Sequence, residues 1–141
     1  MITGHNHTSL TVSDLERSIA FYTENLNFRV AERFEAKGEG IERITALPGA
    51  HLNIAFLTLG DFRLELIQYL APPGVKLDTA TNNVGSAHIA FWVDDAMQTY
   101  EELKAKGVRF KGPPSRSRPG RPLAVYFWDP DDVTLELVEQ Q

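Results

Sequence analysis

Two histidines and two glutamates occupy repeated positions in this chain and could bind a divalent metal ion together. His7 and His88 each precede a valine by five residues and an aspartate by seven, and Glu65 and Glu136 each lie between two leucines. Two imidazole nitrogens and two carboxylates suit Zn²⁺, Ni²⁺, Co²⁺, Mn²⁺ or Fe²⁺. Such an ion can polarise a carbonyl group, stabilise an enediolate or acidify a bound water. The chain has no cysteine, so thiolate ligands and disulfides are excluded.

Each of these four residues also has an ordinary structural interpretation. A histidine in a strand is usually packed or solvent-facing, and a glutamate between two leucines is usually the outward residue of an amphipathic strand. Duplication alone can copy surface residues. The equivalent placement of the four residues in both halves nevertheless favours the metal hypothesis.

The repeated segments predict two copies of a βαβββ module. The first half carries about ten additional residues, which fall within Ala36–Ala50. Strands are expected at His5–Ser13, Asn27–Glu35, Leu52–Leu59 and Phe62–Tyr69 in the first half, and at Ala87–Val93, Val108–Lys111, Leu123–Trp128 and Val133–Glu139 in the second.

Helices are expected between the first two strands of each half. The segment Ser13-Asp-Leu-Glu16 has the pattern of a capping box, which predicts a helix over Leu15–Leu26. The equivalent helix is expected at Ala96–Lys106, with Gly107 as its terminator. A short additional helix is expected at Gly40–Leu47.

Strand alternation indicates where the four chemical residues point. Side chains at every second position of a strand share a face. His7 therefore faces away from Leu10 and Val12, which belong under the helix, and Glu65 faces away from the leucines beside it. His88 and Glu136 follow the same rule. If the two sheets curve toward each other, the two histidines and two glutamates meet in one cleft.

Length and composition narrow the class of protein. The chain has 141 residues, of which 43% are hydrophobic and 23% charged, and its net charge is −5. We expect a single domain at 1–141, made of module 1 at 1–71, a linker at 72–83 and module 2 at 84–141. The negative charge disfavours nucleic acid as a partner, and no segment approaches the ~18 apolar residues of a membrane span. No leader pattern begins the sequence, so a cytoplasmic location is expected.

The same segments resemble a known superfamily. The runs that carry the resemblance are His7–Tyr22, Arg63–Leu66, Ser86–Phe91 and Asp129–Leu137. They look like the vicinal oxygen chelate superfamily, which includes glyoxalase I, methylmalonyl-CoA epimerase, extradiol dioxygenases, and bleomycin- and fosfomycin-resistance proteins. The resemblance implies an α+β fold in which tandem βαβββ modules form a U-shaped mixed-sheet cleft around one divalent ion, and it implies a homodimer. It places the metal ligands on His7, Glu65, His88 and Glu136.

Departures from individual members bear on the substrate. Bacterial glyoxalase I enzymes carry an arginine where this chain has Thr11 and an asparagine where it has Tyr69, which disfavours glutathione. The run Asn53–Ile67 resembles the epimerases, although Asn53 lies near the place of an epimerase carboxylate. Extradiol dioxygenases use two histidines and one glutamate for Fe²⁺, and here His51 and Tyr126 could supply their additional groups.

Three functions follow as hypotheses. The first is proton transfer next to a metal-chelated carbonyl of a small-molecule substrate, with Glu65 or Glu136 as the base, in an isomerase, epimerase or lyase. The second is an Fe(II) extradiol-type dioxygenase. The third is a non-catalytic protein that sequesters a ligand, as bleomycin-resistance members do.

Substrate contacts are expected from a basic loop and from aromatic strand residues. Arg116, Arg118 and Arg121 could clamp a carboxylate or phosphate, although a solvated loop is the commoner interpretation. Trp92 and Tyr126 could line an apolar pocket, although aromatic strand residues more often belong to a core.

Overall fold

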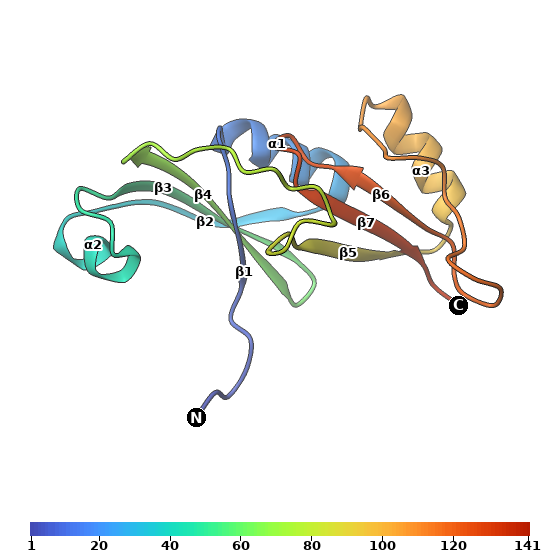
Figure 1. Cartoon of the computed structure of the whole chain (residues 1–141), viewed down its shortest axis with the longest axis horizontal. Helices are drawn as coiled ribbons and strands as arrows, with labels where there is room; N and C mark the ends of the chain where they lie inside the picture. Colours follow the sequence, from blue (N-terminus) through green and yellow to red (C-terminus); the bar gives the residue numbers. More distant parts are fainter. The chain divides into compact units, whose positions relative to one another are not determined.

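The structure is a computed structural model that describes all 141 residues. It consists of two compact units, Met1–Lys76 and Leu77–Gln141. The fold class is α+β, as predicted, with one sheet and at least one helix in each unit (Figure 1). None of the three helices combines the length and the apolar character needed to span a bilayer.

The first unit is built on a four-stranded sheet. Its strand order is β1-β4-β3-β2, in which β1 runs parallel to β4 and the other neighbours are antiparallel. The elements of this unit are β1 (Thr8–Thr11), α1 (Leu15–Leu26), β2 (Arg29–Lys37), α2 (Glu39–Thr45), β3 (His51–Leu59) and β4 (Phe62–Ala71). Strand β1 is shorter than predicted, so His7 lies just before it.

Helix α1 packs against one face of this sheet, which we call the helix face (Figure 1). The helix buries Leu15 and Tyr22 completely, and the sheet contributes Leu57, Leu64 and Leu66, none of which retains exposed surface. The opposite face, which carries Glu65, is the site face. It has its own apolar cluster, in which Ile41 of α2 packs near the buried residues Ala50, Leu52, Ile54 and Phe56.

The second unit repeats the first with one strand fewer. Its elements are β5 (His88–Val93), α3 (Ala96–Ala105), β6 (Ala124–Trp128) and β7 (Thr134–Glu139). The sheet order is β5-β7-β6, with β5 parallel to β7. Leu135 and Leu137 are buried on its helix face, and Glu136 between them lies on its site face.

The prediction of a strand at Val108–Lys111 is wrong. Only a single bridge, Phe110 to Phe127, forms there, flanked by two backbone hydrogen bonds to β6. The residues that follow are Gly112, Pro113 and Pro114. Because proline has no N–H group to donate, the ladder along β6 is interrupted at the two prolines and resumes only as an isolated bridge between Ser115 and Ala124.

Both long helices are held to their sheets by equivalent hydrogen bonds. The N–H group of Leu15 donates to Gln68 Oε1 at 2.9 Å, and the N–H group of Ala96 donates to Glu139 Oε2 at 3.1 Å. Gln68 and Glu139 each lie three residues after the predicted glutamate ligand. These bonds satisfy helix N–H groups that have no partner within the helix. They fix each helix to the strand that carries the glutamate.

Helices α1 and α3 are capped at their N-termini by aspartates. Asp14 accepts from the N–H group of Arg17 at 3.0 Å, and Asp95 accepts from the N–H group of Gln98 at 2.8 Å. The predicted capping box placed Ser13 at the cap, one residue too early. The aspartate two residues after the repeated valine is therefore the helix start in both units.

Candidate functional site

The first unit brings His7 and Glu65 together on its site face. Glu65 is paired in register with Ser9, and His7 lies two residues before Ser9. Strand alternation therefore places the imidazole beside the carboxylate. His7 Nε2 lies 3.2 Å from Glu65 Oε2, and the glutamate side chain is 12% exposed.

The second unit brings His88 and Glu136 together in the same way. Glu136 is paired with Ala90, which lies two residues after His88. His88 Nε2 lies 3.2 Å from Glu136 Oε2, and the glutamate side chain is 19% exposed. The two units thus place a His–Glu pair at the same register and the same separation.

An aromatic ring completes each pair. Phe56 lies opposite Glu65 across the antiparallel strands, and its ring centroid is 5.3 Å from that of His7. Tyr126 lies opposite Glu136, with its centroid 5.2 Å from that of His88. The rings limit the freedom of the imidazoles and shield one side of each pair from water.

The separation of the two donors in each pair fits two ligands of one metal ion. Two donors about 2.1 Å from an ion lie about 3.0–3.4 Å apart when they occupy neighbouring coordination positions. Both pairs fall within this range. The nitrogen and oxygen donors also match the preferences of first-row divalent ions. Each unit gathers two such donors, and in neither unit do three or more His, Asp or Glu side chains form a group that could hold a metal.

His7 is oriented by a neighbour outside the pair. Its Nδ1 lies 2.6 Å from Asn6 Oδ1, and this contact orients the ring. Nε2 faces Glu65, and a hydrogen bond from Nδ1–H to the amide oxygen would leave Nε2 able to bind a metal ion. This is the arrangement in which metal-binding histidines are commonly held.

The other histidines lie apart from the two pairs. His5 Nε2 is 3.3 Å from the hydroxyl of Thr8. His51 Nε2 is 2.9 Å from Glu35 Oε2, and this hydrogen bond, followed by the Coulomb attraction of His51, lowers the pKa of Glu35.

His51 and Asn53 alternate with Leu52 along β3, so they point to the helix face and away from Glu65. The suggestion that His51 supplies an extra group for a dioxygenase site is therefore wrong within this unit. Asn53, likewise, cannot take the place of an epimerase carboxylate beside Glu65.

Two of the predicted substrate contacts lie on the face of the second sheet that carries His88, and the other three lie in an exposed loop. Tyr126 lies beside its His–Glu pair, and Trp92 shares the face of His88 and is 68% exposed. In the basic loop, Arg116 Nη1 donates to the carbonyl oxygen of Arg121 at 2.5 Å, and the backbone N–H of Arg121 donates to the carbonyl of Arg118. The three arginines are exposed, and the loop is organised by its own hydrogen bonds.

Lys111 is a site-face residue that the sequence did not single out. Its backbone N–H donates to the carbonyl of Tyr126 at 2.9 Å, and its ammonium group donates to the hydroxyl of Thr134 at 2.7 Å. The signal available in the sequence was its place at the end of the strand predicted at Val108–Lys111. The register that brings it to Tyr126 could not be read from the sequence.

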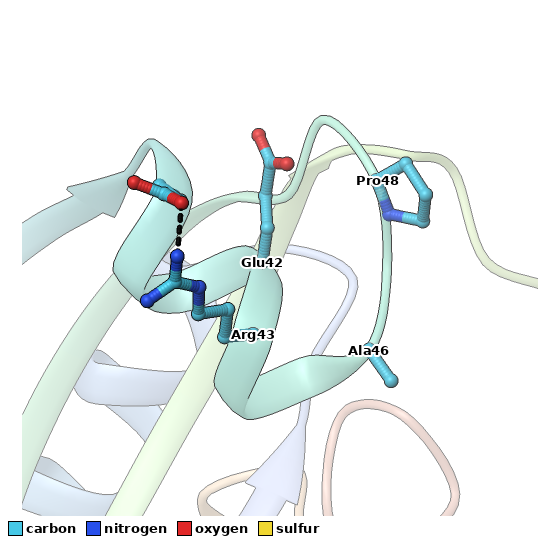
Figure 2. Close-up of a pocket in the computed structure, with 5 residues that line it drawn as sticks. Glu42, Arg43, Ala46 and Pro48 are labelled. Atoms are coloured by element: carbon cyan, nitrogen blue, oxygen red, sulfur yellow. Dashed lines mark hydrogen bonds and ion pairs between the residues drawn. The ribbon is translucent and has the colours of Figure 1, made fainter.

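A surface hollow of about 320 Å³ lies beside α2 (Figure 2). An ion pair between Glu39 and Arg43 crosses one side of it. None of the predicted site residues lines it. Its lining consists of Glu39, Glu42, Arg43, Ala46 and Pro48.

Comparisons with known proteins agree with this architecture. The sequence profile of the Glyoxalase/Bleomycin resistance protein/Dioxygenase superfamily matches residues 4–137. A 2-epi-5-epi-valiolone epimerase from Actinomyces sp is 33% identical, over 94% of this chain and 77% of the epimerase. A lactoylglutathione lyase from Salmonella typhimurium is 30% identical, over 94% of this chain and 90% of the lyase.

A solved structure with the same fold holds a divalent ion. It is a variant of the fosfomycin resistance protein FosX from Listeria monocytogenes, in complex with Mn(II) and 1S,2S-dihydroxypropylphosphonic acid. The TM-score is 0.69 at 25% identity, over 98% of this chain and 90% of that chain. Because the profile match spans nearly the whole sequence, the chain belongs to the glyoxalase, bleomycin resistance protein and dioxygenase superfamily.

Proposed function

We propose that this protein is a divalent-metal-dependent enzyme that moves a proton to and from the carbon next to a carbonyl group in a small-molecule substrate. An isomerase, an epimerase or a lyase would each use this step. The observation that carries the proposal is the repetition of one His–Glu pair, at the same strand register and the same 3.2 Å separation, in both units. Relatives named as an epimerase and as a lyase support the reaction class.

The proposed metal ligands are His7, Glu65, His88 and Glu136, two from each unit. One ion bound by all four ligands would make the two units a single functional domain, with residues 72–83 as the linker. Zn²⁺, Ni²⁺, Co²⁺, Mn²⁺ and Fe²⁺ are the candidates, and the Mn(II) of the FosX structure supports a divalent ion. A homodimer is part of the proposal, and the four ligands could come from one chain or from two copies.

When bound, a divalent ion would withdraw electrons from the substrate carbonyl and so make the neighbouring carbon more acidic. Glu65 and Glu136 are the acceptors for the proton that leaves this carbon. Each carboxylate has one oxygen engaged by an imidazole, and an ionised carboxylate can accept further hydrogen bonds. Each can therefore hold the proton and return it.

The substrate is proposed to differ from a glutathione adduct. Tyr69 packs near the buried apolar cluster on the site face of the first unit. Thr11 is exposed and carries no charge that could pair with a glutathione carboxylate. One relative of similar sequence is named for a substrate that is not a glutathione adduct, and this supports the proposal.

Solvent deuterium exchange tests the base role. Wild-type protein loaded with metal should exchange the proton next to the carbonyl of a turned-over substrate, drawn from a panel of acyl-CoA thioesters, hemithioacetals and catechols. Glu65→Gln and Glu136→Gln should each reduce the exchange rate by about 10²-fold or more at full metal occupancy. The control is Glu32→Gln, which neutralises an exposed carboxylate on the same face of the sheet. Glu32 lies opposite Phe56, which lies opposite Glu65. Wild-type exchange rates in both site variants would remove the base role.

The same preparation distinguishes the other two functions. Bound iron with oxygen-dependent turnover of the catechols would assign a dioxygenase. Tight ligand binding without a stoichiometric metal ion and without turnover would assign a sequestering protein. Either result would contradict the proposed proton transfer.

A further inference from the structure

The site face of the second unit carries a cation that has no carboxylate partner. Lys111 lies opposite Tyr126, which lies opposite Glu136, so the three side chains form one row across the sheet. The ammonium nitrogen is 5.6 Å from the centroid of Tyr126 and 5.2 Å from that of Trp128. No ion pair is formed by this lysine.

A buried hydroxyl holds the ammonium group in place. Lys111 Nζ donates to Thr134 Oγ1 at 2.7 Å, and Thr134 is only 1% exposed. Thr134 is paired in register with His88 and lies two residues before Glu136. An ammonium group has three donors, so two remain after the bond to Thr134. The hydroxyl that holds the ammonium group belongs to the residue opposite His88 in the sheet.

The equivalent row in the first unit has the opposite sign. Glu32 stands opposite Phe56, which stands opposite Glu65. The nearby guanidinium group of Arg63 lies 3.9 Å from the centroid of Phe56 and 3.5 Å from Glu32 Oε2, so a carboxylate already balances it. Lys111, by contrast, forms no ion pair that would balance its charge in this way.

We propose that Lys111 binds a compact anionic group of the substrate, a carboxylate or a phosphate, beside the His88–Glu136 pair. This inference rests on the proposed function and names the substrate class: a carbonyl compound that also carries an anionic group. A preorganised ammonium group gains a charge-assisted hydrogen bond without first breaking an ion pair. The faces of the Tyr126 and Trp128 rings attract a cation and help to hold the ammonium group in place.

Anion titrations of the full chain test the assignment. The protein, freed of metal with EDTA, is titrated with sodium phosphate and separately with sodium acetate at constant ionic strength, and the NMR signals of Thr134 and Tyr126 are followed. We expect saturable shifts in the wild type, and the anion with the higher affinity identifies the group. Lys111→Gln should weaken binding by about tenfold or more, and Lys111→Arg should keep most of it because it retains the charge.

Lys104→Gln is the matched control. Lys104 also lies over a tyrosine, with its Nζ 3.1 Å from the hydroxyl of Tyr100 and 5.0 Å from the ring centroid, but it lies on α3. The substitution Lys104→Gln removes the same charge as Lys111→Gln and should leave the affinity for the anion unchanged. The proposal is overturned if Lys111→Gln binds as the wild type does, or if Lys104→Gln weakens binding equally.

Metal binding measured on the same samples separates the two proposals. Lys111-dependent anion binding in a protein that binds no divalent ion would refute the proposed function and retain the anion site. Metal binding without any effect of Lys111 would refute the anion site and retain the proposed function.

Discussion

Shortening Glu65 or Glu136 by one methylene group should weaken metal binding, and the two substitutions should have similar effects. In Glu65→Asp the carboxylate moves away from His7 by about one carbon–carbon bond, roughly 1.5 Å. The 3.2 Å separation between the two donors then grows to as much as about 4.7 Å, beyond the roughly 3.4 Å that two neighbouring ligands of one ion can span. Glu136→Asp produces the same change, since its register and distance are the same.

The expected loss of affinity is at least about 100-fold for each variant. Disturbing a group that only orients a ligand already costs about 10- to 100-fold, and these variants displace the ligand itself. Competition between the protein and a chromophoric chelator for Zn²⁺ or Mn²⁺ measures the affinity, and circular dichroism verifies the fold. Glu32→Asp should bind as the wild type does. Wild-type affinity in Glu65→Asp and Glu136→Asp would refute the reasoning from the donor separation.

Two further predictions concern the surrounding fold. Gln68→Ala should lower the free energy of unfolding by about 1 kcal/mol, because the first N–H group of α1 loses its hydrogen-bond partner. Glu139→Gln keeps an acceptor oxygen for the N–H group of Ala96 and should change the free energy of unfolding little. Urea denaturation measures both variants, and an equal loss in the two would contradict the role of these hydrogen bonds. His51→Ala should raise the pKa of Glu35 toward its ordinary value, as followed by an NMR pH titration. In the wild type the lowered pKa means that this interaction stabilises the fold above the ordinary glutamate pKa and is lost as the pH falls through the lowered pKa. An unchanged Glu35 pKa in the variant would exclude the hydrogen bond as its cause.

The parts of the site that follow from local patterns could be predicted from the sequence. Alternation along a strand fixes which residues share a face, so the site-face positions of Glu65 and Glu136 followed directly. Alternation likewise placed His7 and His88 on the faces opposite the helices, but the pairing of each histidine with the glutamate of its own unit was not predicted. The bounds of α1 followed from its apolar periodicity and from a polar residue at its start.

The parts that depend on pairing between distant strands could not be predicted. Lys111 reaches the site face because its segment pairs with Tyr126, and two prolines interrupt that pairing directly afterwards. His51 resembled a spare site residue, yet it alternates onto the helix face and binds Glu35. Pattern alone sets neither the partner strand nor the register, since both depend on packing across the whole sheet.

Metal content tests the central claim most directly. After exposure to a mixture of divalent ions and mild desalting, elemental analysis should find about one ion per chain, because four ligands of the types on His7, Glu65, His88 and Glu136 fill the ordinary coordination of one ion. His7→Ala and His88→Ala should each lose the ion, since each removes half of one His–Glu pair. A wild-type protein without a stoichiometric ion, or full occupancy in either variant, would contradict the account.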